Sequence, residues 1–301
     1  MITLKQEKLS LAQGIDAYLA YYKTKGVVQK SYDGKKAMLD KLLLFIGNEY
    51  LEDLKEPLLN FYTITMNRDD IATNSKGTYL RSIKAFVNWL NKEYQLSLPL
   101  PFIVSEQTIK GTYTNEELQI LIKKPNKWKN FSEYRNWIII QLLIDTGMRS
   151  ATLRNIKHSD IYYKEGYIIT RHSKTKKQQI IPISKTMAAE MKKYEFYTQQ
   201  YEYLFTDIYG NQLSENALKL AIRKYNTSRG VSKTSIHLFR HTFAKRYLME
   251  MNGDPFRLQK LLGHSTMNTT RNYVAIYDKD LLDQYELTSP LELLHNKKIK
   301  L

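Results

Sequence analysis

The chain of 301 residues has no cysteine, so disulfide bonds and thiolate metal sites are excluded. A long hydrophobic run is also missing, because the longest one, Trp137 to Ile144, contains Gln141 and is far too short to span a bilayer. Charge throughout the amino-terminal stretch argues against a signal peptide. We therefore expect a soluble, cytoplasmic protein that has no membrane partner.

Signatures of cofactor chemistry are missing as well. The sequence has no Walker loop and no carboxylate cluster with the spacing of a two-metal site, so we expect neither a metal nor a nucleotide cofactor. Acidic residues are scarce: 30 Asp and Glu stand against 46 Lys and Arg, a formal net charge of +16. This excess favours a polyanionic partner, most simply nucleic acid, although a ribosomal or membrane-surface protein could share it.

The first part of the chain predicts a bundle of about four helices. A hydrophobic content of 43% and the length of the chain allow two folded domains, and we assign residues 1–95 to the first. Hydrophobic residues recur at helical spacing in three stretches, with a shorter segment between them. The expected helices cover residues 9–24, 29–46, about 57–66, and 73–94.

The last of these helices has a basic edge. Lys76, Arg81 and Lys84 lie away from its expected hydrophobic face. On so basic a chain they predict contact with DNA phosphates, and the alternative is a solvated helix face. Residues 96–111, with two prolines, are typical of an inter-domain linker that would let two domains close around a duplex.

The second domain, residues 112–288, predicts a mixed architecture. Residues 133–146 form a helix that is apolar nearly all round and therefore buried, and Gly147 ends it just before Arg149. Short strands near residues 167–169 and 180–182 flank a basic turn. Further helices are expected over residues 185–200 and 213–226. The second of these carries two candidate DNA contacts, for which a solvated face is the alternative: Lys219 and Arg223.

The stretch from His237 to Tyr273 contains the residues with the clearest chemistry. Its spacing predicts a helix with His237 and Arg240 on one face, then a second helix that ends at Gly263, directly before His264. A tyrosine near pKa 10 is a poor nucleophile unless its target is strongly polarised. A phosphodiester becomes such a target when arginine and histidine donors neutralise the charge on its oxygens. These residue types therefore fit attack by Tyr273 on a DNA phosphate.

Three sequence blocks resemble the signature blocks of the tyrosine recombinase (phage integrase) family: LLIDTGMRSATLRNI, HLFRHTFA and LLGHSTMNTTRNYV. The family has an arginine in the first block, HxxR in the second, and a histidine followed by a tyrosine in the third. The matching residues here are Arg149, His237, Arg240, His264 and Tyr273. The resemblance implies a mainly helical fold with a small β-hairpin or sheet, in which an amino-terminal helical DNA-binding domain and a mixed α/β catalytic domain form a clamp.

The resemblance also implies a mechanism. Tyr273 would attack the scissile phosphate and form a 3′-phosphotyrosyl link, while the two arginines and His264 stabilise the transition state and His237 assists proton transfer. The family's hairpin carries a lysine that protonates the departing 5′ oxygen, and Lys174 in the basic turn matches best. Its neighbours Lys176 and Lys177 are the alternatives, and a phosphate-contacting loop without a catalytic role is another. Lys176 is also a candidate DNA contact.

The implied partners are double-stranded DNA with a short inverted-repeat core site and three further copies of the chain. Residues 289–301, with an apolar cluster near their start, would dock on a neighbouring protomer of a tetramer, or else pack on their own protomer. An accessory DNA-bending protein is a further expected partner. Integration or excision of a phage or transposon, resolution and inversion would all use the same catalytic residues.

Two features depart from the family's pattern. The position three after Arg149 is usually acidic, and here it is Thr152, so we expect slightly weaker preorganisation of the site. We also expect no separate domain ahead of the helical bundle, and therefore recognition of the core site alone. Two other functions stay open: a type IB-like topoisomerase or hairpin resolvase with the same chemistry, and a non-catalytic DNA-binding protein on this scaffold.

Overall fold

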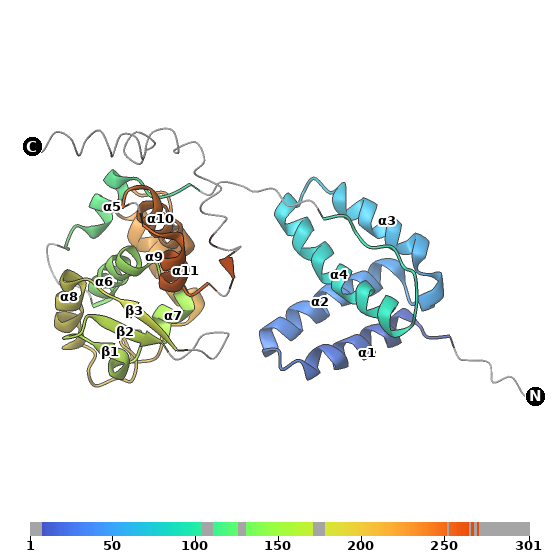
Figure 1. The fold of residues 1–301 in the computed structure, drawn as a ribbon, viewed down its shortest axis with the longest axis horizontal. Coiled ribbons are helices and arrows are strands. Elements are labelled where there is room, and N and C mark those ends of the chain that lie inside the picture. Colours follow the sequence, from blue (N-terminus) through green and yellow to red (C-terminus); the bar gives the residue numbers. More distant parts are fainter. Residues whose placement is uncertain are drawn as a thin grey trace, which may run out of the picture. The chain divides into compact units, whose positions relative to one another are not determined.

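The computed structural model describes residues 8–103, 111–125, 131–170, 178–251, 253–264, 266–267 and 270. The chain divides into two compact units, Met1–Thr108 and Ile109–Leu301, and each has its own hydrophobic core. Figure 1 shows a purely helical group and a second group in which a small sheet lies beside the helices. None of the helices in these ranges combines the length and the apolar character that crossing a membrane requires.

The first unit is the predicted helical bundle. Ser10 starts the first helix with a capping box, in which its hydroxyl accepts from the N–H of Gln13 and the Gln13 side chain accepts from the N–H of Ser10. Leucines and aromatic residues at helical spacing form the core, and Leu80 and Phe86 are fully buried. The helices are α1 (Leu11–Thr24), α2 (Gln29–Ile46), α3 (Lys55–Met66) and α4 (Thr73–Glu93).

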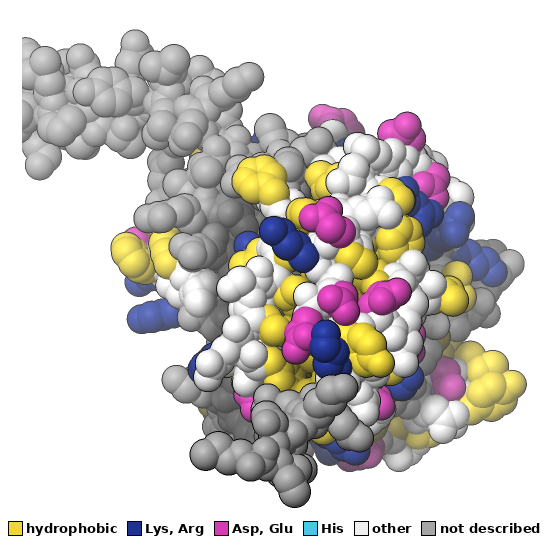
Figure 2. All heavy atoms as spheres, turned by 90° about the vertical axis from the view of Figure 1, so that its right-hand side faces the viewer, with side chains coloured by type: hydrophobic (Ala, Val, Ile, Leu, Met, Phe, Trp, Pro, Cys, Tyr) yellow, Lys and Arg dark blue, Asp and Glu magenta, His cyan; other side chains and the backbone are white. Residues whose placement is uncertain are grey.

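One face of the described chain is mixed in character. Figure 2 shows a face on which acidic, basic and hydrophobic side chains lie among one another. Because a duplex-binding surface gathers basic side chains along a stripe, this face is a poor candidate for one. The first unit also exposes large hydrophobic side chains, of which Leu44 is 87% and Val28 is 68% exposed.

The second unit is built around one buried helix, α6 (Phe131–Thr146). Ile138, Ile139 and Ile140 are each fully buried, so the helix is covered on every side, as its sequence predicted. It packs against α5, α8, α9 and α10. The helices of this unit are α5 (Asn115–Ile122), α6, α7 (Ser150–Arg154), α8 (Lys185–Glu195), α9 (Glu215–Thr227), α10 (Ile236–Met249) and α11 (Pro255–Leu262).

A small antiparallel sheet completes the second unit. Its strands are β1 (Ile161–Tyr162), β2 (Tyr167–Thr170) and β3 (Gln179–Pro182), in the order β1-β2-β3. Ile168 stands opposite Ile161 on one side and Ile181 on the other, and all three side chains join the core. The hairpin of β2 and β3 was predicted from the change to strand-like spacing. Its connection lies outside the described residues.

Candidate active site

Helix α10 carries the first pair of predicted catalytic residues. Phe239 is fully buried in the main core of the second unit and Ala244 in a smaller hydrophobic cluster with Leu258 and Leu262. This packing fixes the helix that presents Arg240, whose own exposure is only 6%. The Arg240 guanidinium donates from Nη1 to the carbonyl oxygen of Gly147 (3.0 Å) and from Nη2 to that of Leu262 (2.8 Å). The helix therefore holds a buried cation between the carboxy-terminal ends of α6 and α11.

Arg149 approaches the same point from α7. Helix α6 ends at Thr146, and the next residue, Gly147, has a φ of +59° in the left-handed region. A Cβ on Gly147 would stand 2.7 Å from the ring of Phe243. This glycine turns the chain and places Arg149 at the N-cap of α7. Arg149 donates from Nη1 to the carbonyl oxygen of Leu262 (3.2 Å) and from Nη2 to that of Gly263 (3.0 Å). Both guanidinium groups thus share the Leu262 oxygen.

The end of α11 explains why two cations can meet there. Asp254 caps the start of the helix by accepting from the N–H of Arg257 (2.7 Å), and Pro255 follows in the first turn. Gly263 ends the helix in the left-handed conformation, with a φ of +61°. The last carbonyl groups of a helix carry partial negative charge, which nearby cations stabilise. The helix end therefore holds the two arginines close together.

His264 follows directly and lies within reach of both charges. Its backbone N–H donates to the carbonyl oxygen of Gln259 (3.0 Å), and its ring Nδ1 is 2.9 Å from the hydroxyl of Thr270. Burial, with the positive charges of Arg240 and Arg149 close by, lowers the pKa of the His264 imidazole to about 4. The ring is therefore neutral at pH 7 and carries a single N–H.

A glutamine fastens the β-hairpin to the same helix end. Gln179 is the first residue of β3, and its Nε2 donates to the carbonyl oxygens of Leu261 (2.8 Å) and Lys260 (3.2 Å). Gly263 packs so closely against this side chain that a Cβ on the glycine would collide with it. The base of the hairpin that leads to Lys174 is therefore tied to the helix end that holds the two arginines.

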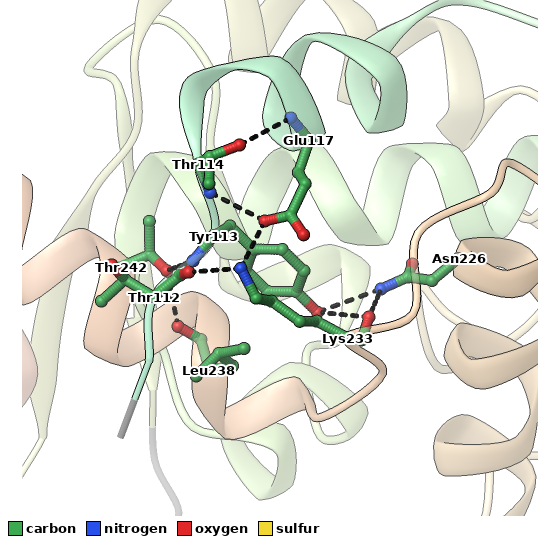
Figure 3. A network of polar contacts seen from close by, with 8 residues as sticks. All are labelled: Thr112, Tyr113, Thr114, Glu117, Asn226, Lys233, Leu238 and Thr242. Carbon is green, nitrogen blue, oxygen red and sulfur yellow. Dashed lines mark hydrogen bonds and ion pairs between the residues drawn. The ribbon is translucent and has the colours of Figure 1, made fainter. Parts of the chain in front are cut away.

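A second network, shown in Figure 3, anchors α10 at the entry to the second unit. The N–H of Tyr113 donates to the Thr242 hydroxyl (3.0 Å), and the Tyr113 ring stacks on Phe239 with the ring centroids 4.3 Å apart. Lys233 donates from Nζ to the carbonyl oxygen of Thr112 (2.9 Å) and to a carboxylate oxygen of Glu117 (2.7 Å). The segment that enters this unit is thereby joined to the helix that carries Arg240.

Three of the six predicted catalytic residues meet in the structure: Arg149, Arg240 and His264. His237 lies in the first turn of α10, three residues before Arg240, with an exposed side chain. Lys174 and Tyr273 lie outside the described residues, so their predicted roles stay predictions. The same holds for Lys176 as a DNA contact.

The predicted DNA contacts have varied surroundings. Lys76 donates from Nζ to the carbonyl oxygen of Met66 (2.9 Å) and so closes the end of α3, a structural role that its sequence position did not indicate. Lys219 forms a solvated ion pair with Glu215, four residues earlier (2.7 Å). The remaining described candidates comprise two exposed side chains and one half-buried one: Arg81, Arg223 and Lys84. Their contact with DNA stays a prediction.

Sequence reasoning missed two residues of this region, Gln179 and Thr270. Each contacts a partner that comes close only in the folded chain. Gln179 donates to carbonyl groups 81 and 82 positions later in the sequence. No local pattern marks a glutamine at the start of a strand as a tether. Thr270 could have been noticed, because its hydroxyl lies in the same short block as His264 and Tyr273.

Comparison with known proteins gives the family. Residues 112–280 match the model of the phage integrase family, a range that contains the arginine and histidine site. The chain belongs to that family. The predicted fold, mainly helical with a small sheet and two domains, is confirmed. The predicted enzyme class, a tyrosine recombinase that cleaves and rejoins DNA at specific sites, is also confirmed.

Individual relatives cover most of the chain. A tyrosine recombinase XerC from Thermodesulfovibrio yellowstonii is 29% identical over 227 residues, which are 70% of this chain and 74% of that protein. A probable integrase/recombinase of Acholeplasma phage L2 is 30% identical over 215 residues, which are 68% and 73% of the two chains. The solved structure of a lambda integrase tetramer bound to a Holliday junction is similar in fold. Its TM-score is 0.70 at 18% identity, and the match covers 88% of this chain and 80% of that one.

Proposed function

We propose that this recombinase works through a 3′-phosphotyrosyl intermediate on Tyr273, with Arg149, Arg240 and His264 as the group that binds the scissile phosphate. The observation that carries the proposal is the meeting of two guanidinium groups and a neutral imidazole at one end of α11. Guanidinium groups bind phosphate oxygens through charge-assisted hydrogen bonds, which strengthen as charge develops during attack. Preorganised donors of this kind stabilise the transition state more than the ground state.

The cleavage step exchanges one phosphorus–oxygen bond for another. The phenol oxygen of Tyr273 forms a bond to phosphorus, and the bond from phosphorus to the 5′ oxygen breaks. The phenol proton leaves with the assistance of His237, and Lys174 delivers a proton to the departing 5′ oxygen. Rejoining is the reverse reaction, in which a 5′ hydroxyl attacks the phosphotyrosine and releases Tyr273. The covalent link conserves the phosphodiester bond energy between the two steps.

The DNA partner follows from charge and from the two units. We assign residues 1–95 to a core-DNA-binding domain, residues 112–288 to the catalytic domain and residues 96–111 to the linker between them. A net charge of +16 supplies the counterion-release contribution to binding a duplex. Double-stranded DNA with a short inverted-repeat core site is the substrate that this arrangement fits.

Assembly into a tetramer on paired sites is part of the same proposal. Exchange of strands between two duplexes needs four cleavage events, and the structurally similar lambda integrase is a tetramer on a Holliday junction. Residues 289–301 are the segment that we expect to dock on a neighbouring protomer. An accessory DNA-bending protein would act at particular DNA sites and would take no part in the cleavage reaction.

Tyr273→Phe tests the nucleophile. The variant keeps the ring and loses the attacking oxygen, so DNA binding should match that of the wild type while covalent protein–DNA adducts disappear. Denaturing gel electrophoresis after incubation with a nicked DNA site measures the adduct, and a mobility-shift assay measures binding. A surviving adduct would show that another tyrosine is the nucleophile.

Lys174→Ala tests the general acid. Sulfur in place of the 5′ bridging oxygen makes a leaving group that needs no proton, so the variant should cleave the sulfur substrate almost as fast as the wild type does. On the oxygen substrate we expect it to be slower by about 100-fold or more, the usual contribution of a positioned acid. Lys176→Ala is the matched control. Equal slowing of Lys174→Ala on both substrates would remove Lys174 from this role.

A further inference from the structure

The hydroxyl of Thr270 is buried beside the His264 ring. Thr270 is 0% exposed and His264 is 8% exposed, and the Thr270 Oγ1 is 2.9 Å from His264 Nδ1. Gln259 holds the His264 backbone at both of its polar groups: its carbonyl oxygen accepts from the His264 N–H (3.0 Å), and its Nε2 donates to the His264 carbonyl oxygen (3.3 Å). The backbone and one ring nitrogen are therefore both fixed.

A neutral imidazole has two tautomers, and a hydroxyl beside Nδ1 can form a hydrogen bond with either of them. If the hydroxyl donates to Nδ1, the ring proton is on Nε2. If Nδ1–H donates to the hydroxyl oxygen, Nε2 carries a lone pair. A lone pair directed at a phosphate oxygen repels it, whereas an N–H there donates a hydrogen bond. A His264 ring that is neutral at pH 7, with a pKa near 4, cannot hold both protons.

We propose that Thr270 is a positioning residue that selects the Nε2–H tautomer of His264 by donating its hydroxyl proton to Nδ1. The inference rests on the proposed function of His264, which is to donate a hydrogen bond to the scissile phosphate. Thr270 would place the ring proton on the nitrogen that makes this bond. The same bond joins His264 to the block that reaches Tyr273 three residues later in the sequence.

The tautomer itself is measurable in the whole protein without DNA. We would label the six histidines with nitrogen-15 and record long-range proton–nitrogen correlations at pH 7, assigning His264 from the signal lost in His264→Asn. In the wild type and in Thr270→Ser, which keeps the hydroxyl, we expect the Nε2–H pattern. Thr270→Val has the same shape without a donor and should move the ring toward Nδ1–H. An Nδ1–H pattern in the wild type, or an unchanged pattern in Thr270→Val, would overturn the proposal.

Cleavage kinetics give the second readout. Thr270→Val should lower the first-order cleavage rate by about 10- to 100-fold, as loss of an orienting partner does at other functional histidines, with the DNA dissociation constant nearly unchanged. Thr270→Ser should recover most of the rate. A Thr270→Ser variant as slow as Thr270→Val would contradict a role for the hydroxyl. Failure of the proposed function looks different, because then the wild type itself would form no covalent adduct.

Discussion

Burial beside two guanidinium groups lowers the pKa of His264 to about 4, against 6.5 for an ordinary histidine. The unfolded chain therefore binds a proton between these values that the folded chain does not bind. Stability from this residue is present above pH 6.5 and is lost as the pH falls toward 4. The phosphate of a bound duplex would offset the two cations, so DNA binding should raise this pKa.

His264→Gln tests this residue-level electrostatic account. Because glutamine does not titrate, the free energy of unfolding of the variant should change less between pH 6.5 and 4 than that of the wild type. The difference corresponds to at most about 3 kcal/mol for the full shift in pKa. Urea unfolding at several pH values measures it, with His158→Gln as the matched control at a histidine away from the site. Parallel curves for His264→Gln and the wild type would contradict a buried, neutral His264.

At the scale of elements, the end of α11 is the junction of the site. Its last carbonyl groups accept hydrogen bonds from α7 through Arg149, from α10 through Arg240, and from β3 through Gln179. Polar groups at a buried helix end are costly when they lack partners, so each tether stabilises the helix end as well as placing its own element. Loss of one of these hydrogen-bonding side chains should therefore also alter the positions of the other elements that bind the end of α11.

Gln179→Leu tests the tether of the hairpin. The substitution leaves the carbonyl groups of Lys260 and Leu261 without the amide donor and should lower the free energy of unfolding by about 1–3 kcal/mol. Gln178→Leu, at the exposed neighbouring position, is the control and should stay within about 0.5 kcal/mol of the wild type. Urea denaturation compares the three proteins. Equal stability of both variants would show that the tether contributes nothing.

Element boundaries show what sequence could and could not predict. Helices α1, α2 and α4 begin and end within about two residues of their predicted bounds, and α11 ends where it was predicted to end. Hydrophobic spacing and glycine stops such as Gly47 and Gly263 are local signals. Helix α8 was predicted to continue to residue 200 and ends at Glu195. There the chain turns, and the carbonyl oxygen of Thr198 lies 2.9 Å from His158 Nε2, a contact between distant segments. Helix α7 and strand β1 are too short to show a period.

The residues of the site also divide into those that the sequence predicted and those that it did not. Arg149, Arg240 and His264 were predicted because the family's blocks mark them, and the structure brings them together. Gln179 was missed because its partners are carbonyl groups that approach only in the folded chain. Sequence position therefore predicted the residues that come together at the end of α11. It did not identify the groups that hold them.

At the scale of the whole molecule, the last residues should matter for assembly and not for chemistry. Deletion of residues 289–301 should reduce recombination between two sites much more than cleavage of one site, because only the former needs contacts among protomers. Gel assays of strand exchange and of adduct formation, run on the same preparation, compare the two activities. Unchanged recombination by the shortened protein would show that this segment does not join protomers.

The most direct test of the whole mechanism is recovery of host-genome fragments that stay covalently attached to the wild-type protein after mild denaturation. Sequencing would locate the DNA, and peptide mass spectrometry would locate the attachment. A phosphotyrosine-linked fragment on Tyr273 that maps to one short inverted-repeat site is the predicted result. Scattered fragments would indicate a relaxing enzyme of the topoisomerase kind. Absence of any attached fragment would contradict a covalent mechanism and favour a protein that only binds DNA.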